Sequence, residues 1–380
     1  MPKPVILVFI DWFLPGYKAG GPVSSCANLV EHLRAEFEFR IVTRNTDYTE
    51  SEPYPGIRPN TWIEREEGVY VYYFSQDQLR IGNIKKLISQ TRPDKVYLNG
   101  IYSRYFTLYP LLLLNRKKNM IVVAARGMLA SSAIAVKKKK KTFFLGIVGL
   151  ARLFRNVTFH ATNPDEVNDI RKQFGQNCHV LLAGNLAPGI IQKENKRRTK
   201  EQGSLSLISV ARIAPEKNLL FALRVLRKIR TCRISFQVYG PVYDLAYFKQ
   251  CEEEMKELSS NIKVSFKGSI EPERVHGMLS ECHGLWMPTR GENFGHIIVQ
   301  SWAAGCPVVI SDQTPWHNLS EKGLGWDIPL TNPEEFVQTL ETFAGMSQTA
   351  FDNLSDTCVA FAAQRAADTN LVEDNKRLFR

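Results

Sequence analysis

Short apolar runs alternate with amphipathic segments along the whole chain. In the first half, apolar runs predict strands at 5–10, 37–43, 69–74, 95–98, 120–124, 157–161 and 178–182, and helices are predicted at 23–34, 84–90 and 104–115 and from 163 onward. After residue 203 the pattern restarts, with strands at 205–210, 234–239, 262–266, 284–287 and 307–311 and helices at 217–228, 245–258, 271–280, 294–304, 333–343 and 354–376. Strands that alternate with helices predict parallel sheets.

The two series of strands are separated by a polar, charged stretch, APGIIQKENKRRTKEQG, which we interpret as a linker at 187–203. This predicts an α/β protein with two Rossmann-like domains, at 1–186 and 204–355, that face each other across a cleft. A C-terminal helix is predicted at 356–380, and packing of this helix against the first domain is one possibility.

The composition excludes several classes of protein. A hydrophobic share of 44% in 380 residues is enough for two cores and excludes a disordered chain. Apolar runs stay short of the ~20 residues that span a bilayer, and the first run ends at Asp11, which disfavours a signal peptide. The seven cysteines are scattered and form no CxxC pair, so neither a zinc knuckle nor a disulfide framework is indicated and a reducing cytosol is expected.

Positive charge is concentrated in the first half. The net charge is +11, and the stretch between Asp94 and Asp165 holds 13 basic residues and no acidic one. This asymmetry indicates an anionic partner, either nucleic acid or an anionic membrane surface. No nucleic-acid motif is present, so we favour the membrane. A lysine cluster beside a ten-residue apolar run is typical of an interfacial anchor, and the contact candidates are Lys137, Lys138, Lys139, Lys140, Lys141, Phe143 and Phe144. The alternative is a buried helix with solvated flanks.

Polar residues follow two predicted strands of the second half. Arg212 and Lys217 come after the strand at 205–210, at the start of a helix, where the helix N-terminus already favours an anion. Two cations there suit a diphosphate, although a solvated pair that caps a loop is an equal alternative. The strand at 284–287 is followed by a Gly-containing polar loop, whose backbone N–H groups could bind an anion or sugar hydroxyls and whose Glu292 could accept hydroxyl hydrogen bonds.

The string PTRGENFGHIIVQSWAAGCPVVISDQTPW resembles the nucleotide-sugar loop of retaining GT-B glycosyltransferases, in particular glycosyltransferase family 4. Further matches occur in the family's order along nearly the whole chain. They are Gly20-Gly21, Ala125-Arg126-Gly127-Met128-Leu129, Val210-Ala211-Arg212 with Pro215-Glu216-Lys217, Tyr239-Gly240-Pro241 and Phe266-Lys267-Gly268.

The resemblance implies site residues. The catalytic candidates are Arg212, Lys217 and Glu292, and the donor-binding candidates are Gly20, Gly21, Gly240, Gly268, Asn293, Phe294, Gly295, His296 and Gln300. For His296, packing at the helix start is an equal alternative. Two departures from the family stand out: Gln300 replaces a glutamate that typically holds the ribose, and Arg126 replaces a histidine that contacts the transferred sugar.

Acceptor contacts are expected in the first half, from Trp12, Tyr17, Asn99, Arg126 and His160. For Asn99, a turn role is favoured over an acceptor contact. For His160, a structural histidine on an apolar strand is favoured over a ligand contact.

The implied function is retaining transfer of a sugar from a nucleoside diphosphate to a glycan, lipid-linked in our interpretation, in cell-surface polysaccharide synthesis. No D-x-D motif occurs, so we expect a metal-independent hexosyl- or glycosyltransferase (EC 2.4) without a cofactor and without a nucleic-acid partner. The expected location is the cytoplasm, at the inner face of the cell membrane. A soluble acceptor, or a catalytically weak sugar-nucleotide-binding partner protein, is the alternative.

Overall fold

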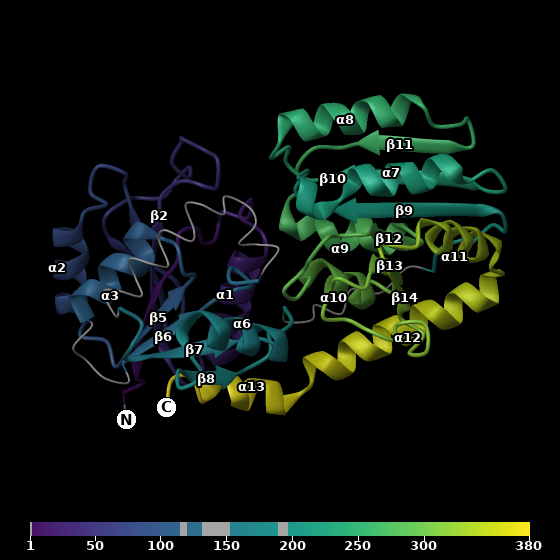
Figure 1. Cartoon of the computed structure of the whole chain (residues 1–380). Helices are drawn as coiled ribbons and strands as arrows, with labels where there is room; N and C mark the ends of the chain where they lie inside the picture. Colours follow the sequence, from purple (N-terminus) through teal and green to yellow (C-terminus); the bar gives the residue numbers. More distant parts are fainter. Residues whose placement is uncertain (1, 115–119, 131–152, 189–196) are drawn as a thin grey trace. The chain divides into compact units, whose positions relative to one another are not determined.

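A computed structural model describes residues 2–114, 120–130, 153–188 and 197–380, and Figure 1 shows their helices and strands. The chain forms two compact units. Unit 1 comprises Met1–Gly189 and Asp368–Arg380, and unit 2 comprises Ile190–Ala367. The second boundary therefore lies after α12 (Gln348–Ala366), whereas the predicted start of a separate C-terminal segment at residue 356 lies within that helix.

Unit 1 is built on an eight-stranded sheet of order β3-β4-β2-β1-β5-β6-β7-β8. All neighbouring strands are parallel except β3 and β4, which pair antiparallel at one edge. The strands are β1 (Val5–Phe9), β2 (Glu38–Arg44), β3 (Trp62–Glu66), β4 (Val69–Phe74), β5 (Lys95–Asn99), β6 (Ile121–Ala124), β7 (Val157–Ala161) and β8 (His179–Leu182).

Helices cover both faces of this sheet, which is why its central strands are apolar on both sides. One core joins the sheet to α2 (Ile81–Thr91), α3 (Tyr109–Leu114) and α6 (Pro164–Phe174). The other joins it to α1 (Gly21–Leu33) and to the end of the chain, which carries α13 (Thr369–Lys376). A π-helix, η1 (Arg104–Leu108), leads into α3.

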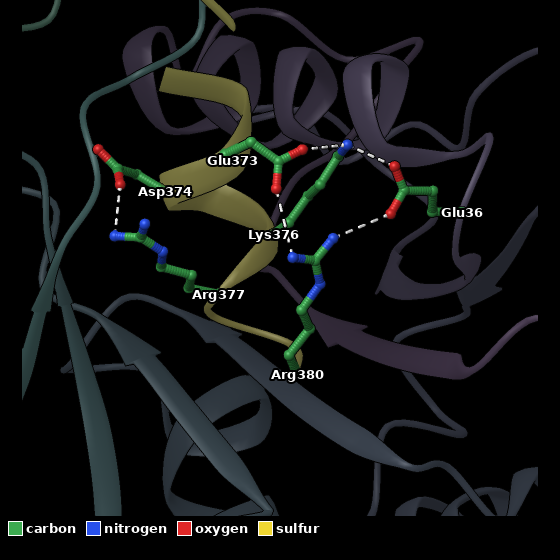
Figure 2. A network of polar contacts seen from close by, with 6 residues as sticks. All are labelled: Glu36, Glu373, Asp374, Lys376, Arg377 and Arg380. Atoms are coloured by element: carbon green, nitrogen blue, oxygen red, sulfur yellow. Dashed lines mark hydrogen bonds and ion pairs between the residues drawn. The ribbon is translucent and has the colours of Figure 1, made fainter. Parts of the chain in front are cut away.

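The C-terminal tail is part of the core of unit 1. Phe379 is 4% exposed, and its ring packs edge-on against Phe37, Phe39 and Tyr97 with centroids 5.5–6.0 Å apart. Around it, Glu36 pairs with Lys376 and, at 3.3 Å, with Arg380, as Figure 2 shows. The C-terminal residues therefore complete the apolar core of unit 1, and an ion-pair network surrounds them at the surface.

Unit 2 has a six-stranded, wholly parallel sheet of order β11-β10-β9-β12-β13-β14. One face packs on α7, α8 and α11, and α10 contacts β12 and β13 together with α9 and α12. The elements are β9 (Ser204–Val210), η2 (Pro215–Lys217), α7 (Leu219–Lys228), β10 (Arg233–Tyr239), α8 (Leu245–Lys256), β11 (Ile262–Phe266), α9 (Pro272–Glu281), β12 (Gly284–Met287), α10 (His296–Ala303), β13 (Val308–Ser311), β14 (Gly325–Ile328) and α11 (Pro333–Gly345).

The structure differs from the sequence-based prediction in three elements. Strand β3 was not predicted because its residues are mostly exposed at the sheet edge, where the pattern WIERE has no apolar run. Strand β14 was not predicted because it is short and carries Asp327. The helix predicted at 354–376 is two helices, α12 and α13, and the Asp368 side chain caps the second by accepting from the Asn370 N–H.

Candidate functional site

The switch point of the sheet of unit 2 is defined by its strand order. Strand β9 lies between β10 and β12. The chain runs outward from β9 through β10 to β11 on one side, and from β12 through β13 to β14 on the other, so the strand order reverses between β9 and β12. In open parallel sheets, ligands bind at the carboxyl edge at such a switch point. The loops that leave β9 (211–218) and β12 (288–295) meet there, and they carry the predicted catalytic residues.

These two loops are joined by hydrogen bonds. The carbonyl of Glu216 accepts from the Arg290 N–H at 2.9 Å and from the Thr289 hydroxyl at 3.0 Å. Asn218, which is buried and has a φ of 62°, donates to the Pro288 carbonyl at 3.0 Å and accepts from Arg290 Nε at 3.1 Å. Asn218 was not among the predicted residues. The only signal in the sequence is an asparagine at the start of a helix, a residue type that tolerates a left-handed backbone.

Lys217 and Glu292, from the two loops, form an ion pair. Their side chains are 18% and 16% exposed, so the pair is mostly but not wholly removed from solvent. The structure therefore brings together two of the three predicted catalytic residues, 75 positions apart in the chain. An anion that approached Lys217 would compete with Glu292 for its ammonium group.

Arg212, the third predicted catalytic residue, has other partners. Its guanidinium lies 3.5 Å from the Glu216 carboxylate and 5.2 Å from the centre of the Tyr243 ring. About a third of its side chain is exposed. Arg212 is thus a solvent-accessible cation on the β9 loop, and its pairing with Glu216 is a surface contact that contributes little stability.

The loop before α10 ends at a glycine with a left-handed backbone, which caps the helix without a side-chain hydrogen bond. Gly295 has a φ of 75°, and a Cβ atom there would lie 2.7 Å from Ile298 Cδ1, so glycine is required. Phe294 is buried, its carbonyl accepts from Trp316 Nε1, and its ring packs on Trp316 and His296. Arg365 of α12 lies over the Trp316 and Phe294 rings, at 5.0 and 5.4 Å. This packing holds the N-terminus of α10 in place.

The other predicted donor-binding residues of unit 2 lie on the same edge. Asn293, His296 and Gln300 are partly exposed on the β12 loop and on α10. Gly240 follows β10, and a Cβ there would lie 1.8 Å from the Ala211 carbonyl oxygen, so this glycine allows the β10 and β9 exits to pack. Gly268 follows β11, where its carbonyl accepts from the Gly240 N–H at 2.7 Å.

A second polar cluster lies at the carboxyl edge of the sheet of unit 1 and is centred on Arg126. All three guanidinium nitrogens donate to neutral oxygens at 2.7 Å: Nε to Asn99 Oδ1, Nη1 to Asn185 Oδ1 and Nη2 to the Tyr97 hydroxyl. Asn99 also donates to the Pro22 carbonyl at the start of α1, at 3.3 Å. Arg126 therefore joins β5, β6 and the segment after β8, and Asn99 has more than a turn role.

His160 is enclosed in this cluster. Its side chain is buried, with Nδ1 2.8 Å from the Tyr97 hydroxyl and Nε2 2.8 Å from the Ala183 carbonyl. The carbonyl can only accept, so Nε2 carries the proton and Nδ1 accepts from Tyr97. Burial, with a smaller contribution from the Arg126 charge, lowers the pKa of His160 to about 3. Both ring nitrogens are thus engaged, which corrects the expectation of an acceptor contact in favour of the structural alternative.

The predicted residues of the first loop are spread along the segment after β1. The Trp12 ring lies against the Tyr48 ring at 4.7 Å. The Tyr17 backbone N–H donates to the buried Asp47 carboxylate at 3.0 Å. Gly20 has a φ of 73° with open space around it, and Gly21 begins α1. Asp47, which was not predicted, also accepts from the Lys18 N–H and so shapes this loop.

Three further predictions concern the membrane and metals. The proposed membrane segment, Lys137–Lys141 with Phe143 and Phe144, lies outside the described residues. Within the described ranges, no helix combines the length and the apolar character that crossing a bilayer requires. Among those same residues, no three His, Cys, Asp or Glu side chains gather as metal ligands would.

Comparisons with solved structures identify the fold. Sucrose-phosphate synthase from Thermosynechococcus elongatus superposes with a TM-score of 0.73 at 14% identity, covering 100% of this chain and 98% of that one. HepE of Anabaena, solved with UDP and glucose, gives 0.71 at 14% identity, covering 99% and 98%. WaaG, described as a glycosyltransferase involved in lipopolysaccharide biosynthesis, gives 0.64 at 12% identity, with the same coverage. The chain therefore has the GT-B fold, with two Rossmann-like units, as predicted.

Sequence comparison adds the family of the second unit. Residues 190–349 match the sequence model of the family described as glycosyl transferases group 1, so unit 2 carries a domain of this family. An uncharacterized 41.2 kDa protein from the cps region of Klebsiella pneumoniae is 21% identical over 202 residues. That match covers 53% of each chain, so the alignment spans about half the length of this curated relative. The recognition of a GT-B glycosyltransferase domain from its motifs is thereby confirmed.

Proposed function

We propose that this protein is a retaining glycosyltransferase that moves a sugar from a nucleoside diphosphate to a glycan acceptor in the synthesis of a cell-surface polysaccharide. The observation that carries the proposal is the Lys217–Glu292 pair at the switch point of unit 2, inside a domain of glycosyl transferases group 1. Support for the donor comes from HepE, which was solved with UDP-glucose. Support for the product class comes from WaaG and from the relative in a cps region.

Each site residue then has a role. Lys217 and Arg212 bind the donor diphosphate, with the N-terminus of α10, and neutralise the charge that grows on the leaving phosphate. Glu292 accepts hydrogen bonds from the hydroxyls of the transferred sugar. Because Lys217 and Glu292 are neighbours, a donor phosphate that displaced Glu292 from Lys217 would leave the carboxylate beside the sugar.

The reaction follows from these roles. The acceptor hydroxyl attacks the anomeric carbon from the face that the phosphate leaves, so the configuration is retained. The acceptor oxygen forms a bond to the anomeric carbon as the bond between that carbon and the phosphate oxygen breaks. The departing phosphate oxygen takes the proton of the acceptor hydroxyl. Fixed cations suffice for the leaving group, so activity should survive EDTA.

Nucleotide binding is the primary test. Purified protein is screened by thermal shift against UDP, GDP, ADP and a panel of their sugars, because a ligand at a hundred times its Kd stabilises the fold by about 2.7 kcal/mol. A nucleotide sugar that stabilises the protein is then assayed for hydrolysis and transfer. Absence of any stabilisation across the panel would contradict the proposal.

Gln300 favours a second candidate, a sugar-nucleotide-binding partner protein with weak catalysis. An amide in place of the family's usual glutamate can still bond the ribose, but without charge assistance. The two candidates separate by turnover: the partner protein would bind a nucleotide sugar and neither hydrolyse nor transfer it. Gln300→Glu should leave donor binding unchanged or tighten it.

The acceptor and the location are further parts of the proposal. We favour a lipid-linked acceptor at the inner face of the membrane, because the first half of the chain carries the excess positive charge. Flotation with anionic vesicles tests this, using wild type and a variant with Lys137–Lys141 replaced by glutamine. Equal flotation of both would favour a soluble acceptor.

A further inference from the structure

Helix α12 reaches the loop before α10 from outside the family match. That match ends at residue 349, and α12 begins at Gln348, so nearly all of the helix lies beyond it. The guanidinium of Arg365, near the end of α12, lies 5.0 Å from the centre of the Trp316 ring and 5.4 Å from that of Phe294. Neither Arg365 nor Trp316 has a role in the reaction as proposed above.

Trp316 links Arg365 to the loop. It lies on the segment after β13, its ring packs on Phe294 with centroids 5.5 Å apart, and its Nε1 donates to the Phe294 carbonyl. The same segment also holds the loop through a backbone hydrogen bond, from the Glu292 N–H to the Gln313 carbonyl at 3.0 Å. The segment that follows β13 therefore fixes the loop at two points, and Trp316 provides one of them.

Aromatic rings of α10 and α12 complete the cluster. Trp302 of α10 is buried, and it meets the Trp316 ring edge-on at 4.9 Å and the Phe361 ring at 5.2 Å. Phe361 and Arg365 lie four positions apart on α12, so they share one face of that helix. Helix α12 thus contacts the cluster through two successive turns, with a ring on one and a guanidinium on the next.

The charge of Arg365 strengthens this attachment. The face of an aromatic ring is electronegative, so a cation within about 6 Å of the ring centre is attracted, and more strongly where water is excluded. Arg365 meets this condition for two rings at once, and its Nε is buried. A planar guanidinium stacks on such rings, whereas a neutral side chain of similar length would keep only its van der Waals contacts.

The position of the two rings bears on the proposed chemistry. Phe294 comes two residues after Glu292 and directly before Gly295, which leads into α10. A shift of Phe294 would therefore move the carboxylate assigned to the transferred sugar and the helix N-terminus assigned to the leaving phosphate. Because charge grows on that phosphate as its bond to the sugar breaks, a small displacement lowers turnover more than it lowers donor binding.

We propose that Arg365 is a positioning residue for the transfer reaction. It acts through Trp316 and Phe294, and by holding these rings it fixes the loop that carries Glu292 and the start of α10. The inference rests on the proposed function, and it extends the machinery of that reaction to a helix that the family match does not include.

The test compares two variants of Arg365 in the full chain. Arg365→Met keeps much of the length of the side chain and removes its charge, whereas Arg365→Lys keeps the charge. With the nucleotide sugar found by screening, Arg365→Met should lower kcat for donor hydrolysis about tenfold and change KM by less than about threefold, since a misplacement of about 1 Å costs up to about 100-fold. Arg365→Lys should recover most of the rate, because an ammonium group also binds ring faces.

Arg40→Met is the matched control. Arg40, on β2 of unit 1, is another arginine that lies over two rings, 5.7 Å from the centre of Trp62 and 5.5 Å from that of Tyr70. Its replacement removes the same kind of contact at a place with no assigned part in the reaction. Both kcat and KM should therefore stay at their wild-type values.

Trp316→Phe tests the link itself. The variant keeps a ring and loses the Nε1–H that bonds the Phe294 carbonyl. Its kcat should fall as that of Arg365→Met does. The double variant should lose little more than either single variant, because both changes break one attachment and their effects do not add.

A second measurement needs no turnover. Amide hydrogen exchange of the protein without nucleotide reports local opening of the backbone. Peptides that cover residues 289–296 should exchange faster in Arg365→Met than in wild type and in Arg40→Met. Exchange in β9, in the same sheet, should be equal in all three proteins.

The outcomes separate this inference from the function on which it rests. Equal kcat and equal loop exchange in Arg365→Met and Arg40→Met would overturn the positioning role. Faster exchange throughout unit 2 would also overturn it, since Arg365 would then support the fold rather than the loop. A wild type that turns over no nucleotide sugar would contradict the proposed function. In that case, faster exchange confined to the loop of Arg365→Met would still support the attachment, and unchanged exchange would refute it.

Discussion

The two units carry polar clusters at equivalent edges of similar sheets. The clusters differ in whether their charged side chains are open to solvent or fully hydrogen-bonded within the protein. In unit 2, Lys217 and Glu292 form a pair that is partly open to solvent, and Arg212 is one-third exposed. In unit 1, Arg126 donates from every nitrogen to a protein oxygen, and His160 is buried and neutral. A position at the end of a strand therefore does not by itself distinguish a reactive cluster from a structural one. The two are distinguished by whether a charged side chain is still available to a ligand.

The largest expected effect is on turnover at the unit 2 cluster. Lys217→Ala removes a cation that stabilises the leaving diphosphate, and we expect turnover of a nucleotide sugar to fall by about 100-fold or more. Lys228→Ala is the matched control, since Lys228 ends the helix that follows Lys217 and pairs with Glu334 in an exposed contact. Initial rates of donor hydrolysis and transfer measure both. A Lys217→Ala variant as active as Lys228→Ala would remove Lys217 from the mechanism.

The next effect is on stability at the unit 1 cluster. Arg126→Ala leaves Asn99, Asn185 and Tyr97 without a donor in a largely buried setting, so we expect the free energy of unfolding to fall by about 3 kcal/mol. Arg212→Ala, at the exposed cluster, should change it by less than about 0.5 kcal/mol. Urea denaturation of both variants tests the contrast. If Arg126→Ala unfolds like wild type and loses only acceptor affinity, Arg126 is a ligand contact.

The third prediction concerns pH and His160. The unfolded chain takes up a proton near pH 6.5, whereas the folded chain does so only near pH 3, so the unfolded state binds more protons between these values. Stability should therefore fall as the pH decreases through this window, by about 2 kcal/mol between pH 7 and pH 5 from this group alone.

His160→Gln isolates that contribution, because the variant lacks the titrating ring. The stability difference between wild type and variant should shrink by about 2 kcal/mol from pH 7 to pH 5. Should the variant not fold, nitrogen-15 NMR of the wild-type ring replaces the measurement. A ring that stays the neutral Nε2–H tautomer at pH 5 supports the buried cluster, and a protonated ring contradicts it.

The smallest effect is expected where unit 1 does expose its charges. Glu36 bridges Lys376 and Arg380 at the surface, as Figure 2 shows, so Glu36→Gln should lower the free energy of unfolding only slightly. The loss should vanish in 1 M salt. Phe379→Ala, in the core beneath this network, should cost about 3–5 kcal/mol. Similar losses in the two urea titrations would mean that the ion pairs, rather than the ring, hold the tail.

Much of the fold was predictable because most strands are continuous apolar runs. Strands β4, β7 and β12 have the bounds that the pattern predicted, since both faces of these strands are covered and few polar residues interrupt them. The edge strands β3 and β14 could not be predicted in the same way. An edge strand is specified by its neighbour's backbone as much as by its own side chains.

The site was predictable in part. Lys217 and Glu292 were recognised from their motifs, and their contact fits the position of both loops at the β9–β12 switch point. The sequence did not reveal that Arg212 pairs with Glu216, nor that Asn218 joins the two loops. For His160 it favoured a structural role but kept an acceptor contact open, because a histidine near a strand end has the same sequence pattern whether it faces a ligand or a buried tyrosine.

The sequence by itself determined the alternation of strands and helices, the two-domain division and the polar residues that follow the strands, because these are local patterns of period and position. The tertiary structure alone decided which of those polar residues keep a charge available. Arg126 meets Asn185 across 59 positions, and Lys217 meets Glu292 across 75. Whether a buried polar group has a hydrogen-bond partner depends on residues that folding brings together from such distances in the sequence. Those partners cannot be identified from the local sequence.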